Sequence, residues 1–477
     1  MDDPGATTGG LGERAKDLKR INRRSSREDI LNVFTPNSPV THRAKFAGRY
    51  KPLEEMINAL LSAGADMIVF GERGSGKSSL ARMLHAVASG DLRILDYYGL
   101  RSYLVKKGIV FGIGSSTTSF NVIWVDGFTR PLDEVIRLVL TRRRDREFGP
   151  GLLAYLPNEP DQVEVASKIG FDKVLTASGE TKEVYVPPKP LNVKEGFEIA
   201  VQRYSDAHDE ELLVLIDEFE TIPDRANISQ YLKTVGRVRF ALMGIATTTL
   251  ELIGQHASVA RDTHAINLAP MAQDELLGIL AIGDYVLSPY LVFTPSAQHE
   301  IVANSHGSPF WCHSLAKALV NQRLEAAEDL RRFLDLRSVP RGDPLRVVDG
   351  AGVHALLDAL PTFAENRIWE EALNQITMQD PLTAHILGRI AHRPEGVISS
   401  AVCCSDLEQE GVSPDDTRQT IEGILGMEGS PLEERGRIRD VVSFSFRDPN
   451  FKRYILLRRV GVDPETPSGA YTPNQGP

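Results

Sequence analysis

The chain has 477 residues, of which 42% are hydrophobic and 25% are charged, an ordinary composition for a globular protein with room for about two or three domains. The formal net charge of −10 excludes a global attraction to nucleic acid or to an anionic membrane, so any such contact needs a local basic patch. The sequence has no apolar run near the roughly 18 residues that span a bilayer, no visible signal peptide, and only three cysteines without metal-ligand spacing. We therefore expect a cytoplasmic protein without membrane contact.

The N-terminal region has two parts. Residues 1–33 are rich in Gly, Thr and charge and predict a disordered or loosely helical leader, whose arginines could form a DNA- or partner-binding arm or simply a solvated tail. Turn residues at 36–39 and the box Phe46-Ala47-Gly48-Arg49 then lead into a helix with apolar residues at helical spacing from Leu53 to Leu61.

A glycine-rich segment follows the apolar run Met67–Phe70 and precedes a helical pattern. Glycines there allow successive N–H groups to cradle phosphate oxygens at a helix N-terminus, while Lys77 reaches the β- and γ-phosphates of ATP and the Ser78 hydroxyl coordinates Mg²⁺. The alternative is a chance glycine-rich turn before an ordinary amphipathic helix. The candidate nucleotide-binding residues are Gly71, Glu72, Arg73, Gly74, Ser75, Gly76, Lys77, Ser78 and Ser79.

A second apolar run, Leu212–Ile216, ends in Asp217 and Glu218. Such a run predicts a strand buried on both faces of a parallel sheet, and ligands of these sheets bind at the carboxyl ends of the strands. Asp217 is the candidate Mg²⁺ residue and Glu218 the candidate base or polariser of the attacking water. Alternatively, the two acids begin a solvated loop.

Three further strands are predicted at Asn121–Asp126, Val238–Ile245 and His264–Leu268, with a helix at Leu132–Arg143 after the first of them. The five strands alternate with helices, which predicts a three-layer α/β ATPase core of the P-loop type at residues 34–271. Surplus length at about 90–120 and 150–190 predicts inserted loops or a hairpin involving Glu183–Val186.

These motifs together resemble a known family. The Phe-x-Gly-Arg box, the Gly-Glu-Arg-Gly-x-Gly-Lys-Ser loop, the acids of Asp217-Glu218-Phe219-Glu220 and the stretch from Gly244 through Gly254-Gln255-His256-x-Ser258-x-x-Arg261 look like bacterial origin-recognition-like AAA+ ATPases, which stand close to the STAND class of signalling ATPases. The resemblance covers about residues 34–330 and extends to the C-terminal part. It implies an ATP-dependent switch that forms a homo-oligomer.

The resemblance also implies roles for two further catalytic candidates. Thr247, with Thr248 as the near alternative, falls where such ATPases place a polar sensor of the γ-phosphate or attacking water. Arg261 falls where one subunit presents an arginine finger to its neighbour's nucleotide, although a surface arginine is the alternative.

Helical patterns at residues 272–330 match the lid of AAA+ proteins, a small helical domain that closes over the core. The lid departs from the AAA+ pattern because Gly307-Ser308-Pro309, a signature of STAND proteins, stands where a sensor arginine is usual. His313 could face the phosphates or pack as a helix residue. The departure favours slow hydrolysis that serves as a switch.

The C-terminal part begins with an expected linker at 331–351 and continues as a winged helix-turn-helix at 352–462, followed by a disordered tail at 463–477. Its predicted parts are helices near 381–392, 403–410 and 413–425, with strands at Val441–Phe446 and Tyr454–Leu457. Double-stranded DNA is a candidate partner, although acids on the third helix oppose groove entry. The candidate phosphate contacts are Arg435, Arg437, Arg439, Lys452 and Arg453.

Three hypotheses follow from the sequence. The first is a slow ATP-dependent switch that assembles with itself and on DNA, and the second is a STAND-like signalling ATPase, in antiviral defence or transposon regulation, triggered by a protein partner. The third is a nucleotide-binding scaffold without turnover, which the presence of Lys77, Asp217 and Glu218 disfavours.

Overall fold

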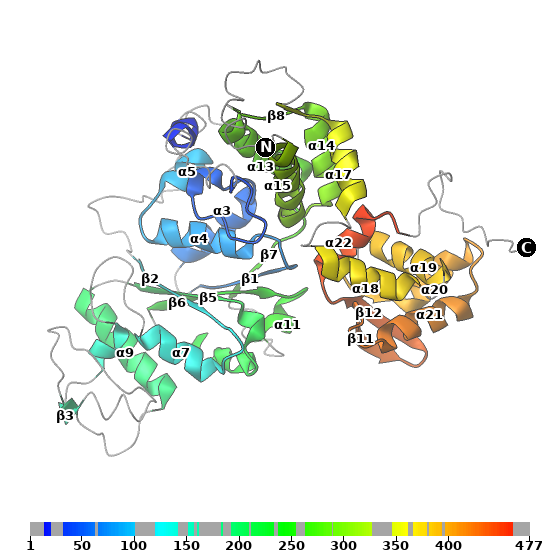
Figure 1. Ribbon diagram of the computed structural model, residues 1–477. Coiled ribbons are helices and arrows are strands. Elements are labelled where there is room, and N and C mark those ends of the chain that lie inside the picture. The colour runs from blue at the N-terminus through cyan, green and yellow to red at the C-terminus, as the bar shows by residue number, and fades with distance from the viewer. Residues whose placement is uncertain are drawn as a thin grey trace, which may run out of the picture. The chain divides into compact units, whose positions relative to one another are not determined.

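The computed structural model describes residues 14–20, 32–62, 65–100, 120–141, 151–156, 160–161, 183–184, 192–208, 211–232, 237–253, 263–288, 290–326, 346–360, 366–378, 381–393 and 396–460 (Figure 1). The chain divides into two compact units. The first comprises Met1–Ile30 and Asn37–Val286, and the second comprises Leu31–Pro36 and Leu287–Pro477. Helix α13 (Gln273–Leu287), which the sequence assigned to a lid, groups with the first unit.

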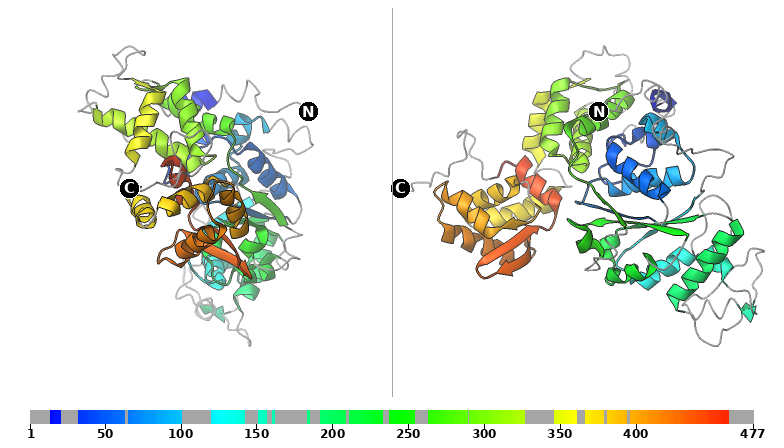
Figure 2. Two further views of the ribbon diagram at one scale, coloured as in Figure 1. Left: turned by 90° about the vertical axis from the view of Figure 1, so that its right-hand side faces the viewer. Right: turned by 180° about the vertical axis from the view of Figure 1, so that it is seen from behind.

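The first unit is built on a five-stranded parallel sheet in the order β2-β5-β6-β1-β7. Every predicted core strand is present. The three inner strands are almost wholly buried between helical layers, whereas β7, at one edge of the sheet, is largely exposed. Figures 1 and 2 show α3 and α4 over one face of the sheet and α7 and α9 over the other. The strands are β1 (Asp66–Gly71), β2 (Phe120–Asp126), β5 (Glu211–Asp217), β6 (Val238–Ile245) and β7 (Thr263–Asn267). Besides α13, the longer helices are α3 (Tyr50–Leu61), α4 (Lys77–Ala88), α7 (Leu132–Thr141) and α9 (Val193–His208), and the shorter ones are α5 (Arg93–Tyr97), α10 (Ser229–Leu232) and α11 (Thr249–Ile253).

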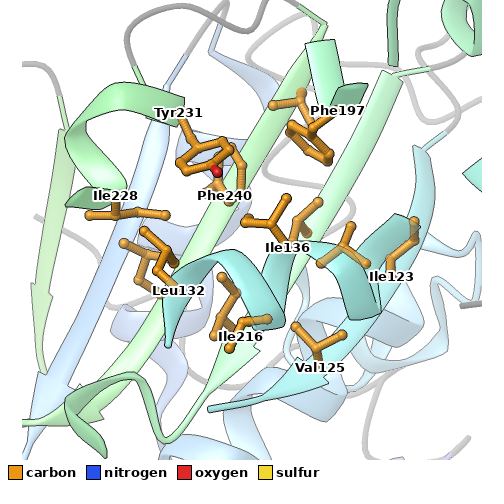
Figure 3. Packing of buried hydrophobic residues seen from close by; sticks show 14 of the residues in the cluster. Ile123, Val125, Leu132, Ile136, Phe197, Ile216, Ile228, Tyr231 and Phe240 are labelled. Atoms are coloured by element: carbon orange, nitrogen blue, oxygen red, sulfur yellow. The ribbon is translucent and has the colours of Figure 1, made fainter. Parts of the chain in front are cut away.

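The layer between the sheet and α7 and α9 is an apolar core (Figure 3). Phe197 of α9 contacts Phe240 of β6 and Tyr231 of α10, with ring centroids 6.2 and 5.9 Å apart. Ile136 of α7 and Ile216 of β5 are fully buried in the same core. This packing fixes the carboxyl end of β5, where Asp217 lies.

The inserted regions are described only in part. In the first, α5 is described and residues 101–119 lie outside the described residues. In the second, β3 (Pro160–Asp161) and β4 (Glu183–Val184) pair in parallel, so these two described strands do not form the hairpin that was one of the two alternatives. A hairpin needs antiparallel neighbours, whereas these strands are joined by a longer connection.

The second unit combines helices with a small antiparallel sheet in the order β10-β12-β11. Strands β8 (Val292–Phe293) and β9 (Val347–Val348) also pair, so part of the expected linker joins a two-stranded sheet beside α14. The helices are α14 (Pro295–Ser305), α15 (Pro309–Ala326), α17 (Gly350–Ala359), α18 (Arg367–Thr377), α19 (Pro381–His392), α20 (Ser400–Glu408), α21 (Pro414–Gly426) and α22 (Pro449–Leu457), and the strands are β10 (Ile398–Ser399), β11 (Leu432–Ile438) and β12 (Val441–Phe446).

One predicted strand of this unit was wrong. Residues Tyr454–Leu457 belong to helix α22, not to a strand. The side chain of Asp448 accepts a hydrogen bond from the Asn450 N–H and Pro449 occupies the first helical turn, which together start a helix. That start signal outweighs the strand preference of the aromatic and branched residues that follow.

An aromatic cluster lies in the core of the second unit. Trp311 of α15 contacts Trp369 of α18 and Tyr454 of α22, with ring centroids 5.4 and 6.3 Å apart. The Tyr454 hydroxyl donates to Glu370 at 2.6 Å. These contacts join α15 to the helices that follow it in the chain. No helix in the described residues is long and apolar enough to cross a membrane.

Candidate functional site

The glycine-rich loop connects the buried strand β1 to helix α4, as predicted. Gly74 and Gly76 have positive φ angles of 78° and 94°, which side chains with a Cβ rarely adopt. A Cβ on Gly71 would lie 2.9 Å from the Leu268 carbonyl oxygen, so the strand end also requires glycine. The geometry is that of a phosphate-binding loop at a helix N-terminus.

Lys77 begins α4 and is buried, with 9% of its surface exposed. Its Nζ donates to the carbonyl oxygens of Gly71 at 3.0 Å and Glu72 at 2.8 Å. Burial lowers the pKa of Lys77 to about 8, although the nearby carboxylates of Glu220, Asp217 and Glu72 oppose that shift. The ammonium group is therefore held inside the loop that surrounds it.

The predicted acids lie at the carboxyl end of β5. Glu218 has a positive φ of 52°, and its N–H donates to the Asp217 carboxylate at 3.0 Å. Burial, followed by the charges of Asp217, Glu220 and Asp126, raises the pKa of Glu218. The neighbouring negative charges make it easier for the Glu218 carboxylate to accept a proton, as a general base must.

Strand β6 lies between β1 and β5 in the sheet. The loop after β1 and the acids after β5 therefore flank the residues that follow β6. Thr247 is the second residue after β6, where its hydroxyl donates to Glu251 at 2.8 Å and its N–H donates to the same oxygen at 2.7 Å. Thr248 accepts a hydrogen bond from the Glu251 N–H. Arg261 lies outside the described residues.

The two adjacent serines of α4, Ser78 and Ser79, were both predicted to take part in nucleotide binding. The Ser79 hydroxyl accepts a hydrogen bond from the Val40 N–H at 3.0 Å, which ties α4 to the segment before the Phe-x-Gly-Arg box. Within the described residues, no group of three or more His, Cys, Asp or Glu could hold a metal ion. A Mg²⁺ at Ser78 and Asp217 would thus take its remaining ligands from water and nucleotide phosphates, as this ion usually does.

Glu220 is a member of the site that was not singled out from the sequence. Its carboxylate is the strongest charge acting on Lys77, and its Oε2 is buried without a hydrogen-bond partner among the described residues. A Cβ on Gly244 of β6 would lie 2.8 Å from that oxygen. The available signal was the third acid in Asp217-Glu218-Phe219-Glu220.

His313 does not act as a free polar group. It is half-buried, its Nδ1 accepts a hydrogen bond from the Thr35 N–H at 3.3 Å, and its ring packs edge-on against Phe34 at a centroid distance of 5.9 Å. Burial lowers the pKa of His313 to about 4, so the imidazole is neutral at physiological pH. Its contacts are those of a packed helix residue.

Most of the candidate DNA contacts are engaged within the protein. Arg437 pairs with Glu422 of α21 at 2.6 Å and with Glu434 at 3.0 Å, and Arg435 pairs with Glu433 at 3.3 Å. Arg453 is 8% exposed, and Lys452 donates to the Arg393 carbonyl oxygen. Arg439 lies exposed in the turn between β11 and β12, with a φ of 53°. A phosphate contact at most of these positions would have to replace existing contacts.

The fold is a parallel α/β sheet covered by helices, with a glycine-rich loop between β1 and α4 and two acids after β5 at the carboxyl ends of its strands. Comparison with solved structures finds chains of similar fold. The Aeropyrum pernix ORC1 protein in complex with DNA is 15% identical with a TM-score of 0.39, covering 90% of this chain and 95% of that one. Cdc6p from Pyrobaculum aerophilum is 13% identical with a TM-score of 0.37, covering 90% and 96%. A mutant of RuvB from Thermotoga maritima is 12% identical with a TM-score of 0.38, covering 87% and 98%.

No protein-family model matches the chain, and no curated protein matches it either. Superposition at these TM-scores is loose. Function must therefore be inferred from the residues of this chain.

Proposed function

We propose that the protein binds ATP with Mg²⁺ and hydrolyses it slowly, as a molecular switch of the AAA+ type. The observation that carries this proposal is the placement of Lys77 after β1 and of Asp217 and Glu218 after β5, on either side of β6 in one parallel sheet. Phosphate binding and water activation need these groups at the same edge of a sheet.

Each group has a role in this chemistry. The N–H groups of Gly74, Ser75 and Gly76 and the Lys77 ammonium bind the phosphates, and Ser78 and Asp217 hold Mg²⁺, which neutralises phosphate charge. Glu218 takes the proton of the attacking water, for which its raised pKa is suited. Thr247 orients the water or the γ-phosphate, and Arg261 serves a neighbouring copy of the chain in a homo-oligomer.

The output of the switch has two candidates. One is assembly on double-stranded DNA through a winged helix formed by α19–α21 and the β11–β12 hairpin. The other is a STAND-like signalling ATPase in which the same region docks a protein partner. The second is favoured by the ion pairs of Arg437 with Glu422 and Glu434, since neutralised arginines attract phosphates weakly.

The test is steady-state ATP hydrolysis by the purified chain beside a Lys77→Ala control, with and without double-stranded DNA at two salt concentrations. Turnover that Lys77→Ala abolishes supports the ATPase. Stimulation by DNA that falls with salt supports the DNA-bound switch, and indifference to DNA supports the protein-triggered one. Equal rates in the wild type and Lys77→Ala would refute the ATPase.

A further inference from the structure

The dipeptide Gly48-Arg49 of the Phe-x-Gly-Arg box has a special backbone and a buried side chain. Gly48 and Arg49 both have positive φ angles, 64° and 57°. The Arg49 residue is 5% exposed, although it stands at the start of α3. A left-handed, buried arginine is costly, because the charge loses water and the backbone is strained. The surrounding contacts must compensate for that cost.

The Arg49 guanidinium holds the P-loop directly. One terminal nitrogen donates to the Ser75 carbonyl oxygen at 2.8 Å, and the other donates to the Ala269 carbonyl oxygen at 2.6 Å, just after β7. A trans peptide is planar, so its C=O and the following N–H point in opposite directions. By fixing the Ser75 carbonyl, Arg49 also fixes the direction of the Gly76 N–H, one of the phosphate-binding donors of the loop.

The backbone of Arg49 is tied to the start of α13. Its N–H donates to one carboxylate oxygen of Glu275 at 2.5 Å, while the other oxygen of Glu275 accepts from the Ala272 N–H at 3.1 Å and so caps the helix. The approach is close, because a Cβ on Gly48 would lie 2.3 Å from the Met271 Cε. The same residue therefore bonds the P-loop with its side chain and α13 with its backbone.

We propose that Arg49 is a positioning residue that aligns the Ser75–Gly76 peptide of the P-loop and transmits the conformation of that loop to the N-terminus of α13. The inference rests on the proposed nucleotide binding. A bound phosphate that engages the Gly76 N–H pulls on the peptide that Arg49 holds, and Glu275 passes the shift to α13. The guanidinium links the Ser75 carbonyl of the glycine-rich loop to the Ala269 carbonyl, which lies between β7 and α13.

The test compares Arg49→Lys with a matched control, Arg239→Lys. Arg239 is also buried, at 6% exposure, and holds Glu211 and the Ser62 carbonyl oxygen. It stands near the start of β6, at the opposite end of the parallel strands from the P-loop. Titration calorimetry measures ATP affinity, and hydrogen exchange with and without saturating ATP follows the amides of 271–280.

We expect Arg49→Lys to bind ATP about tenfold more weakly, because a lysine cannot hold both carbonyls at once. At saturating ATP it should lose the slowing of exchange at 271–280 that the wild type displays. Arg239→Lys should keep both properties, even if its melting temperature falls equally. A second variant, Glu275→Gln, should keep ATP affinity within about threefold and still lose the slowed exchange at α13.

Wild-type ATP affinity in Arg49→Lys, or unchanged protection of 271–280 in that variant at saturating ATP, would overturn the proposal. A failure of the proposed function would be distinguishable, because the wild type itself would then not bind ATP. That result would also remove the basis of this inference.

Discussion

The burial of Lys77 predicts that the proposed ATP binding depends on pH. Burial lowers the pKa of Lys77 to about 8, whereas its usual value is 10.5. Phosphate charge beside the ammonium favours the protonated form, so binding requires a proton wherever Lys77 is neutral. Lys77 is about three-quarters protonated at pH 7.5 and about one-tenth protonated at pH 9, which predicts an affinity about eightfold weaker at pH 9.

Titration calorimetry in buffers of different ionisation enthalpy checks this directly, because it counts protons. Between pH 7.5 and 9 the proton uptake on ATP binding should rise from about one-quarter to about nine-tenths of a proton. Lys77→Arg is the matched control, since arginine stays charged across this range and its affinity should not vary with pH. Equal wild-type affinity at both pH values, or no proton uptake at pH 9, would refute the reasoning.

The same shift affects stability. The folded-state pKa of Lys77 lies below its unfolded value, so the buried ammonium costs about 3 kcal/mol below pH 8, and that cost is relieved as pH rises from 8 to 10.5. Without nucleotide, Lys77→Met should therefore unfold at higher denaturant concentration than the wild type at pH 7, with the difference shrinking towards pH 10.5. A constant difference would contradict the assigned burial cost.

Three further outcomes are expected. Glu218→Gln should bind ATP as the wild type does and lose at least about a hundredfold in turnover, because the general base is removed; an unchanged rate in a phosphate-release assay would remove Glu218 from that role. Gly244→Ala should cost about 1–3 kcal/mol in chemical denaturation, because the new Cβ would lie 2.4 Å from the Leu252 Cδ1, and a neutral result would mean that α11 gives way. Trp311→Ala should cost about 3–5 kcal/mol in unfolding of the second unit, because the 1%-exposed ring anchors the aromatic cluster; a loss below about 1 kcal/mol would contradict that packing.

The parts of the molecule that depend on local pattern could be predicted from the sequence. The P-loop was predictable because the strand, the glycines with positive φ and the helix start are adjacent in the chain. The three inner strands were predictable because both faces of each are buried, which makes their sequences continuous apolar runs. Asp217 and Glu218 could be placed at the same sheet edge as Lys77 because all five strands run parallel.

Features that depend on distant partners could not be predicted in the same way. The ion pair between Arg437 and Glu422 joins a strand to a helix, and neither residue type indicates the other as its partner. Nothing in the local pattern indicated that Arg453 is buried, since its helix was interpreted as a strand preceded by basic residues. The sequence showed Arg49 only as the last residue of the Phe-x-Gly-Arg box. Its hydrogen bonds to Ser75 and Glu275 depend on the tertiary fold.

Two buried cations therefore set the behaviour expected of the phosphate loop. Lys77 supplies a charge whose protonation is sensitive to its surroundings, and Arg49 supplies a permanent charge that holds the loop's backbone. The two residue types suit these two roles. The lysine ammonium is a compact charge on a flexible stem and can adjust to the phosphates, whereas the arginine guanidinium has donors in a fixed arrangement and can orient a peptide. Exchanging the two residue types should therefore be harmful at both positions, and for different reasons: Lys77→Arg alters the fit to the phosphates and removes the pH dependence, whereas Arg49→Lys releases the peptide and leaves the pH dependence intact.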